Sequence, residues 1–121
     1  MVERYTILVV DDQPGIRLLL EEMFIQSGYD VLTAKTGREA LDKIYAHSFD
    51  LVIIDYKLPI LDGIEVIKHL EQHNFTIPFI VMSGLTEYLS NKRHKYSFIK
   101  KVVPKPFDVQ KMSALVQSIL T

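Results

Sequence analysis

The chain has 121 residues, and its 14 lysine and arginine residues against 15 acidic residues give a net charge of −1, which provides no global attraction to nucleic acid. Hydrophobic residues make up 48% of the sequence and charged residues 24%, a composition typical of one folded domain rather than of a disordered chain. Cysteine, a signal peptide and an apolar run of about 20 residues are all absent, which excludes disulfides, thiol chemistry and a membrane span and makes the cytoplasm the expected location.

The first part of the chain alternates short apolar runs with helical patterns. The run from Ile7 to Val10 is short and rich in β-branched residues, which predicts a strand. Apolar residues then recur at helical spacing from Ile16 to Phe24, with Pro14 suited to the first turn of that helix and Gly28 to its end. A second strand is predicted from Asp30 to Ala34.

The next segments continue this alternation. Thr36 followed three residues later by Glu39 has the spacing of a capping box, which predicts the start of a second helix. The segment from Leu51 to Ile54 is apolar throughout, as expected for a strand that is covered on both faces. A third helix is predicted after Asp62 and Gly63. Its apolar positions are Val66, Ile67 and Leu70.

Two further strands follow in the second half. The fourth is predicted from Phe79 to Met82 and the fifth from Ile99 to Val103. The helix between them has apolar positions at Leu85, Tyr88 and Leu89 but an incomplete pattern, because residues 91–95 are polar all round. Asp108 is expected to cap a last helix. The apolar residues of that helix are Met112, Leu115, Val116, Ile119 and Leu120.

Five strand–helix units with apolar strands predict an α/β fold, a (βα)5 doubly wound parallel sheet with helices on both faces. Right-handed crossovers follow for such units. We expect the flavodoxin-like strand order 2-1-3-4-5, although periodicity alone does not fix it. Residues 1–121 are expected to form this one domain, and length alone leaves open that the chain is a fragment of a larger protein.

Polar residues end four of the five predicted strands. In chain order they are Asp11 and Asp12 after the first strand, Asp55 after the third, Ser83 after the fourth and Lys105 after the fifth. In an open parallel sheet, ligands bind outside the carboxyl ends of the strands, where the strand order reverses. Because these four strands are neighbours in the expected order, the polar side chains converge on one rim.

This set of side chains suits phosphoryl transfer. Crowded carboxylates repel one another unless a cation joins them, and oxygen ligands without histidine or cysteine suit magnesium. Lys105 adds a fixed positive charge, and the Ser83 hydroxyl adds a hydrogen-bond donor. Asp55 is the expected nucleophile because it stands alone at the end of the central strand, and Asp11 and Asp12 are the expected metal ligands.

Each of these features also has a plain structural interpretation. An aspartate pair after a strand, or a single aspartate such as Asp55, is commonly a turn or a helix cap. The pairs Ser83-Gly84 and Lys105-Pro106 are ordinary loop sequences. Turn chemistry alone does not require three acids, a hydroxyl and a lysine at one rim, so the combination favours a phosphoryl-transfer site.

Four segments carry a family pattern in order and spacing along essentially the whole chain. They are Val9-Val10-Asp11-Asp12, Asp55 with Leu58-Pro59-Ile60-Leu61-Asp62-Gly63, Ser83-Gly84, and Lys105-Pro106-Phe107. Together they resemble the receiver domain of two-component response regulators. The resemblance implies that Asp55 is phosphorylated with the help of Mg²⁺, by self-phosphorylation and phosphotransfer rather than by conventional enzymatic turnover.

The resemblance also implies roles for the other residues of the rim. The metal ligands would be Asp12, Asp55 and the backbone carbonyl of Lys57, with Asp11 acting mainly through water. Ser83 and Lys105 would contact the phosphoryl oxygens. The Lys105–Pro106 peptide bond would be cis, which the sequence permits.

A narrower resemblance rests on the segment from Asp11 to Leu20 and the triplet Asp55-Tyr56-Lys57. Both are similar to the stand-alone regulators of the sporulation phosphorelay, which take phosphate from a histidine kinase and pass it to a histidine phosphotransferase. In those regulators the first helix and its preceding loop dock on the partner. The corresponding contacts here would be Gln13, Gly15, Ile16 and Leu19. Core packing is an equal explanation for Leu19, and it applies to Ile16 as well.

Two features depart from the family pattern. Val102 stands where receivers usually carry a tyrosine or phenylalanine that swings inward on activation, which argues against a conventional switch surface. The basic stretch from Lys92 to Lys101 precedes the fifth strand. A solvated face is the favoured interpretation of these charges, ahead of a partner-docking surface.

The leading hypothesis is a phosphotransfer intermediate that exchanges phosphate with histidine-bearing partners. It would act as a monomer, without direct binding to nucleic acid or membrane. The alternative is a diffusible regulator whose phosphorylated form binds a target protein. A small phosphatase or a flavodoxin-like cofactor binder would share the fold, but the segment from Asp11 to Pro14 stands where such proteins need a glycine-rich phosphate loop.

Overall fold

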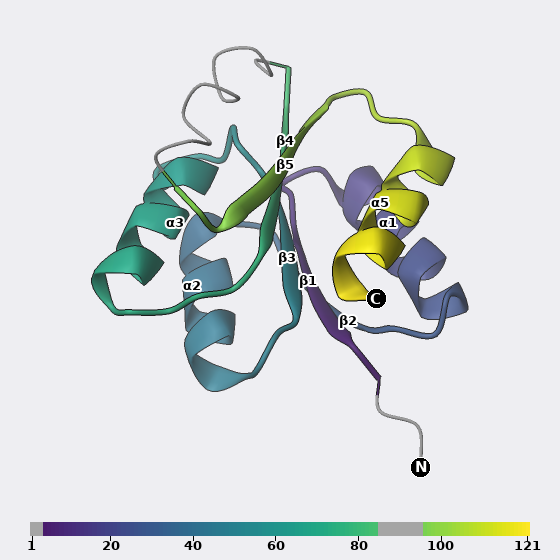
Figure 1. Cartoon of the computed structure of the whole chain (residues 1–121). Coiled ribbons are helices and arrows are strands. Elements are labelled where there is room, and N and C mark those ends of the chain that lie inside the picture. Colours follow the sequence, from purple (N-terminus) through teal and green to yellow (C-terminus); the bar gives the residue numbers. More distant parts are fainter. Residues whose placement is uncertain (1–3, 85–95) are drawn as a thin grey trace.

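The computed structural model describes residues 4–84 and 96–121. Within these residues, five parallel strands form one sheet in the order β2-β1-β3-β4-β5, and four helices pack on it (Figure 1). The strands are β1 (Thr6–Val10), β2 (Asp30–Ala34), β3 (Leu51–Asp55), β4 (Phe79–Ser83) and β5 (Ile99–Pro104). The helices are α1 (Pro14–Gln26), α2 (Gly37–Ala46), α3 (Gly63–Gln72) and α5 (Val109–Leu120). The predicted strand order is confirmed, whereas the helix predicted around Leu85, Tyr88 and Leu89 lies outside the described residues.

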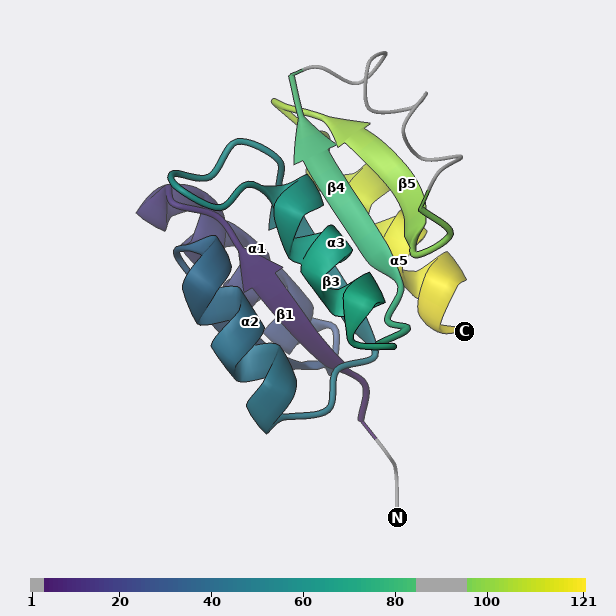
Figure 2. The same cartoon turned by 90° about the vertical axis from the view of Figure 1, so that its left-hand side faces the viewer.

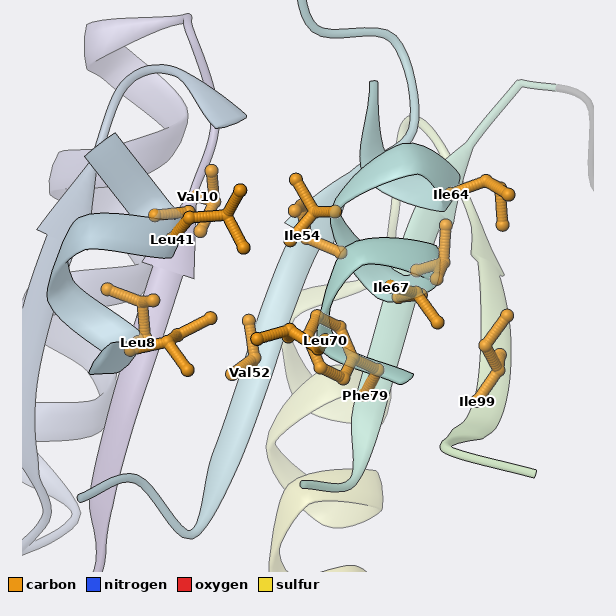
Figure 3. Packing of buried hydrophobic residues seen from close by; sticks show 14 of the residues in the cluster. Leu8, Val10, Leu41, Val52, Ile54, Ile64, Ile67, Leu70, Phe79 and Ile99 are labelled. Carbon is orange, nitrogen blue, oxygen red and sulfur yellow. The ribbon is translucent and has the colours of Figure 1, made fainter. Parts of the chain in front are cut away.

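The sheet is covered on both faces, as the apolar strands predict. Helices α2 and α3 pack on one face and α1 and α5 on the other (Figures 1 and 2). Alternate residues of each central strand therefore enter different cores. In β3, Val52 and Ile54 face α2 and α3 (Figure 3), whereas Leu51 and Ile53 face α1 and α5. Full burial of each such side chain stabilises the fold by about 1.5–3 kcal/mol before the loss of conformational entropy.

The strand register brings the carboxyl ends of the strands to one rim. Val10 of β1 pairs with Ile54 of β3, and Asp55 pairs with Met82 of β4. The loops that follow β1, β3 and β5 lie together at the upper end of the sheet in Figure 1. Among the described residues, no helix is both long and apolar enough to cross a membrane.

Backbone hydrogen bonds continue beyond the predicted strand ends and fix the rim. The Asp11 amide donates to the Ala34 carbonyl at 3.1 Å, and the Lys105 amide donates to the Ser83 carbonyl at 3.1 Å. Pairing also extends β3 to Asp55 and β4 to Ser83, one residue further than predicted. The side chains of the rim are therefore held on the sheet itself rather than on free loops.

The helix caps agree with the sequence in part. The Thr36 hydroxyl accepts from the Glu39 amide at 3.0 Å, but the Glu39 carboxylate accepts from the Lys35 amide and not from that of Thr36. The second half of the predicted capping box is therefore wrong. The chain before Thr36 turns the Lys35 amide, and not the Thr36 amide, toward the Glu39 carboxylate. A complete capping box forms instead at α3, between Asp62 and Glu65.

Other end signals are confirmed. Gly28, just beyond α1, has a φ of 93°, a left-handed conformation that glycine adopts readily. The Asp108 carboxylate accepts from the Lys111 amide at 3.0 Å and caps α5.

Two glycines hold the loop between β3 and α3 tightly in place. A Cβ atom on Gly37 would lie 2.4 Å from the Leu61 carbonyl oxygen, and one on Gly63 would lie 2.9 Å from the Asp55 carbonyl oxygen. The Gly63 amide also donates to the Tyr56 carbonyl at 2.9 Å. The absence of a side chain at these two positions lets the first turns of α2 and α3 close on the loop that follows Asp55.

We expect Gly37→Ala to destabilise the protein by about 1–3 kcal/mol, because the added methyl group would overlap the backbone of Leu61. Unfolding in guanidinium chloride measures the change. Gly15→Ala is the matched control, since its Cβ would meet nothing within 4 Å in the described part of the chain. A Gly37→Ala variant as stable as the wild type would contradict the close packing of this loop.

Candidate functional site

Three carboxylates meet at the rim. Asp11 and Asp12 follow β1, and Asp55 is the last residue of β3. One carboxylate oxygen from each lies within 4.8 Å of the others. Asp11 is 0% exposed and Asp55 5% exposed, whereas Asp12 is exposed. The sequence prediction that these acids converge is confirmed.

Asp11 is fixed by hydrogen bonds on both sides of its carboxylate. One oxygen accepts from the Gln13 amide at 2.9 Å, and the other accepts from the Lys105 ammonium at 2.8 Å. The Arg17 guanidinium donates to the Asp11 carbonyl oxygen at 2.8 Å and so ties α1 to the end of β1. Sequence reasoning missed this role of Arg17, because six residues separate the two and no spacing rule predicts the contact.

Lys105 bridges the two buried acids. Its ammonium lies 2.8 Å from Asp11 and 3.2 Å from Asp55, and its side chain is largely buried. The Lys57 amide donates to the other oxygen of Asp55 at 3.4 Å. Lys105 reaches this position because β5 pairs with β4 and ends at the same rim. The Lys105–Pro106 bond is cis, as the resemblance implied.

Burial raises the pKa of Asp55 above its ordinary value of 3.8, and the Asp11 charge raises it further. The hydrogen bond and charge of Lys105 and the Lys57 amide act in the opposite direction without outweighing them. For Lys105, burial alone would lower the pKa, but the hydrogen bonds and charges of Asp11 and Asp55 outweigh burial and raise it. One ammonium thus contacts two buried acids while a third, Asp12, lies in the same cluster, and the excess negative charge favours a further cation.

The donor set fits a magnesium ion. Three carboxylates supply oxygen atoms within reach of one another, and Mg²⁺ prefers oxygen ligands and retains several waters. Lys57 lies in the loop that begins directly after Asp55, so its carbonyl belongs to the chain next to this carboxylate. The residues present could therefore hold the ion on one side and leave positions open on the other.

A cavity of about 230 Å³ opens beside Asp55. Its lining residues are Asp55, Tyr56, Lys57, Ser83 and Gly84. Ser83, at the end of β4, is only 3% exposed, so the structure places it next to the acid as predicted. A larger cavity of about 400 Å³ lies between β5 and α5, but none of the three clustered carboxylates is among its described lining residues. The chemistry of the rim therefore favours the smaller cavity as the site.

The residues predicted to contact a partner have mixed exposure. Gln13 and Gly15 are exposed at the start of α1, and Leu19 is 41% exposed. Ile16 is half-buried and packs against the core beneath α1, so core packing explains at least part of its presence. The exposed Leu18 was not predicted, because helical periodicity alone does not mark an apolar residue outside the stripe.

Two departures from the family pattern have different outcomes. Val102 is buried in β5, where it pairs with Val81 and joins the core beneath α2 and α3. Of the basic stretch, residues 92–95 lie outside the described residues, whereas Lys100 and Lys101 are exposed on β5.

In buffer containing a chelator, we expect Asp55→Asn to stabilise the protein at pH 7. Because the pKa of Asp55 is raised in the folded state, the folded chain binds a proton at the Asp55 carboxylate more tightly than the unfolded chain does. The stability linked to Asp55 is therefore present below about pH 3.8 and lost as pH rises through the folded-state pKa. Asparagine does not ionise, so the stabilisation of Asp55→Asn relative to the wild type should shrink as the pH falls toward 4.

Urea unfolding at both pH values measures this difference. Asp42→Asn, on the exposed surface of α2, is the control and should change stability by no more than about 0.5 kcal/mol at either pH. A less stable Asp55→Asn variant at pH 7 would show that the charge of Asp55 stabilises the fold.

Proteins with similar sequences match nearly the whole chain. It is 37% identical to sporulation initiation phosphotransferase F of Bacillus subtilis over 114 residues, which cover 94% of this chain and 92% of the relative. It is 39% identical to the alkaline phosphatase synthesis transcriptional regulatory protein PhoP of Bacillus subtilis, again over 94% of the chain. The chain spans about half of that regulator's length, because the match covers 48% of it.

Solved structures with the same fold include three response-regulator proteins. A receiver domain from Francisella has a TM-score of 0.88 at 29% identity, covering 97% of both chains. Response regulator TrrA from Thermotoga maritima, in complex with Mg²⁺–BeF, has a TM-score of 0.83 at 33% identity and covers 96% of this chain and 99% of its own. Chemotaxis protein CheY4 from Vibrio cholerae has a TM-score of 0.85 at 29% identity and covers 98% of this chain and 100% of its own.

The family model of the response regulator receiver domain matches residues 7–117, which include the three clustered acids and every residue of the five strands except Thr6, the first residue of β1. The matched range therefore contains nearly all of the parallel sheet, the acidic rim and the lysine that follows β5. The chain belongs to the response regulator receiver domain family of two-component signalling.

Proposed function

We propose that residues 1–121 form one receiver domain that acts as a phosphotransfer intermediate. It takes a phosphoryl group from a histidine kinase onto Asp55 and passes it to a histidine phosphotransferase. The observation that carries this proposal is the buried Asp55 carboxylate at the end of the central strand, joined to Asp11 through Lys105. The 37% sequence identity to a sporulation phosphotransferase, over 92% of that relative, supports the relay.

Mg²⁺ is the proposed cofactor. Asp12, Asp55 and the Lys57 carbonyl would hold it, with Asp11 acting through water. When bound, the ion neutralises negative charge on the phosphoryl oxygens and on the acids. The likeness to a solved receiver in complex with Mg²⁺–BeF supports this assignment.

The transfer step itself belongs to Asp55. A carboxylate oxygen of Asp55 attacks the phosphorus of a phosphohistidine, the P–N bond breaks, and its electron pair stays on the imidazole nitrogen. In the onward step a histidine nitrogen attacks the phosphorus, and the P–O bond to Asp55 breaks to restore the carboxylate. Lys105 and Ser83 are proposed to hold the phosphoryl oxygens, since both already lie beside Asp55.

Val102 favours a relay over a conformational switch. A buried valine on β5 has no ring that could swing between an outer and an inner position. A diffusible regulator that binds a target protein is the second candidate, because the chain covers the full length of a solved chemotaxis protein. The relay proposal places the chain in the cytoplasm as a monomer without direct contact to nucleic acid, in keeping with its net charge of −1.

Incubation with acetyl phosphate and Mg²⁺ should add one phosphoryl group to the wild type, measured by intact mass. Asp55→Asn should remain unmodified, because it lacks the nucleophile, and a chelator should abolish the reaction. Asp42→Asn, on the exposed surface in the middle of α2, should react like the wild type. Modification of Asp55→Asn, or an unmodified wild type that still binds Mg²⁺, would overturn Asp55 as the acceptor.

If the face of α1 docks on the histidine-bearing partner, Leu19→Ala should slow phosphotransfer from a phosphorylated histidine kinase by about tenfold. Leu19 is 41% exposed, so the fold should tolerate the change. Acetyl phosphate should modify this variant at the wild-type rate. Ile25→Ala, exposed on the last turn of α1 and away from the rim, is the matched control. Equal transfer rates for both variants would remove Leu19 from the docking face.

A further inference from the structure

The loop between β3 and α3 contains a strained turn. The Leu61 amide donates to the Pro59 carbonyl at 2.7 Å, and Ile60 between them has a φ of 70°. A hydrogen bond that spans one residue with positive φ is a γ-turn of the rare, strained form. Isoleucine is poorly suited to this conformation, because its β-branched side chain crowds the backbone there. Glycine or asparagine would adopt it with less strain.

The side chain of Ile60 is also fully exposed, at 102% of its reference area. Its apolar neighbours behave differently: Leu58 is 6% exposed, and Leu61 packs against the core beneath α2 and α3. Both the backbone conformation and the exposure of Ile60 therefore work against the stability of the isolated chain. Backbone strain of this kind persists only where the surrounding structure enforces it, and it clusters at active sites and ligand-contacting segments.

The structure fixes Ile60 in its outward position. Gly37 closes on Leu61 from α2, and Gly63 closes on Asp55 from α3, as the contacts of their missing side chains show. The Leu58 amide also donates to the Tyr56 carbonyl at 3.1 Å. A loop held on both sides cannot turn Ile60 into the core without breaking these contacts. The side chain is presented rigidly, five residues after the phosphoacceptor.

We propose that Ile60 is an apolar anchor for the histidine-bearing partner that docks over Asp55. This inference rests on the proposed function, because a histidine nitrogen must reach the Asp55 carboxylate and its carrier must then cover the surrounding rim. The loop that presents Ile60 begins directly after Asp55. A second group of exposed apolar side chains, Leu18 and Leu19, lies on α1, which starts at the same rim. The partner should therefore carry an apolar recess beside its reactive histidine.

A rigid, fully exposed apolar side chain beside the reacting atoms suits such an anchor. It loses little conformational freedom on docking, because its backbone is already held, and it removes apolar surface from water. Interfaces commonly depend on a few such residues. Because isoleucine is strained at this position in the free protein, its presence is not explained by a contribution to stability.

The test compares Ile60→Gly and Ile60→Asn with the wild type in two measurements. Thermal unfolding should show melting temperatures about 2–5 °C higher for both variants, because the strain is relieved. Phosphotransfer from each purified, autophosphorylated histidine kinase of the source organism should identify the cognate donor. With that donor, both variants should react about tenfold more slowly or worse.

Three controls separate docking from chemistry and folding. Modification by acetyl phosphate should be unchanged in both variants, because this small donor needs no docking surface. Ile60→Leu should restore most of the transfer rate, since it keeps an apolar side chain. Ile25→Asn removes another exposed apolar residue, at the far end of α1, and should leave transfer unchanged.

Wild-type transfer rates in Ile60→Gly and Ile60→Asn would overturn the anchor while leaving the proposed function intact. Slower reaction with acetyl phosphate would also overturn it, because the residue would then act on the chemistry of Asp55. A wild type that is modified by acetyl phosphate but by none of the kinases would overturn the proposed relay and this inference together.

Discussion

The bridge from Lys105 to Asp11 and Asp55 is the interaction on which the rest of the site depends. Asp11 and Asp55 are both at or below 5% exposure, so burial removes their hydration and brings their negative charges close together. Without a cation between them, nothing would compensate for the lost hydration and the repulsion. The ammonium group lies within hydrogen-bond distance of both. Because one positive charge is shared between two buried carboxylates and Asp12 stands beside them, the rim keeps an excess of negative charge. Burial of Asp55, together with the charge of Asp11, raises the pKa of Asp55 above its ordinary value.

The backbone around this bridge is constrained in turn by the sheet and by two close contacts. Parallel pairing carries the hydrogen bonds past the strand ends, and Gly37 and Gly63 let two helices close on the loop after Asp55. The Asp55 carboxylate, held on a paired strand, keeps its position without help from a flexible loop. The same contacts leave Ile60 outside, so the rigidity of the site and the shape of its rim have a common cause.

Much of this arrangement could be predicted from particular residues. The fully apolar run Leu51 to Ile54 indicated a strand covered on both faces, and the polar residues after each strand indicated one rim. The bracing contact of Arg17 could not be predicted, because it depends on how α1 leaves the end of β1. The second half of the capping box at Thr36 was wrong for a similar reason: the direction of the preceding chain decided which amide the Glu39 carboxylate accepts from.

The sequence by itself determined the kind of fold, the segments that form strands, and the set of acids, hydroxyl and lysine that share one end of them. These features depend on local periodicity and on residue chemistry, which the order of residues in the sequence specifies directly. Only the tertiary structure decided the strand order, the burial of Asp11 and Asp55, and the exposure of Leu19 and Ile60. Burial and distance depend on which elements pack together, and residues far apart in the sequence set them.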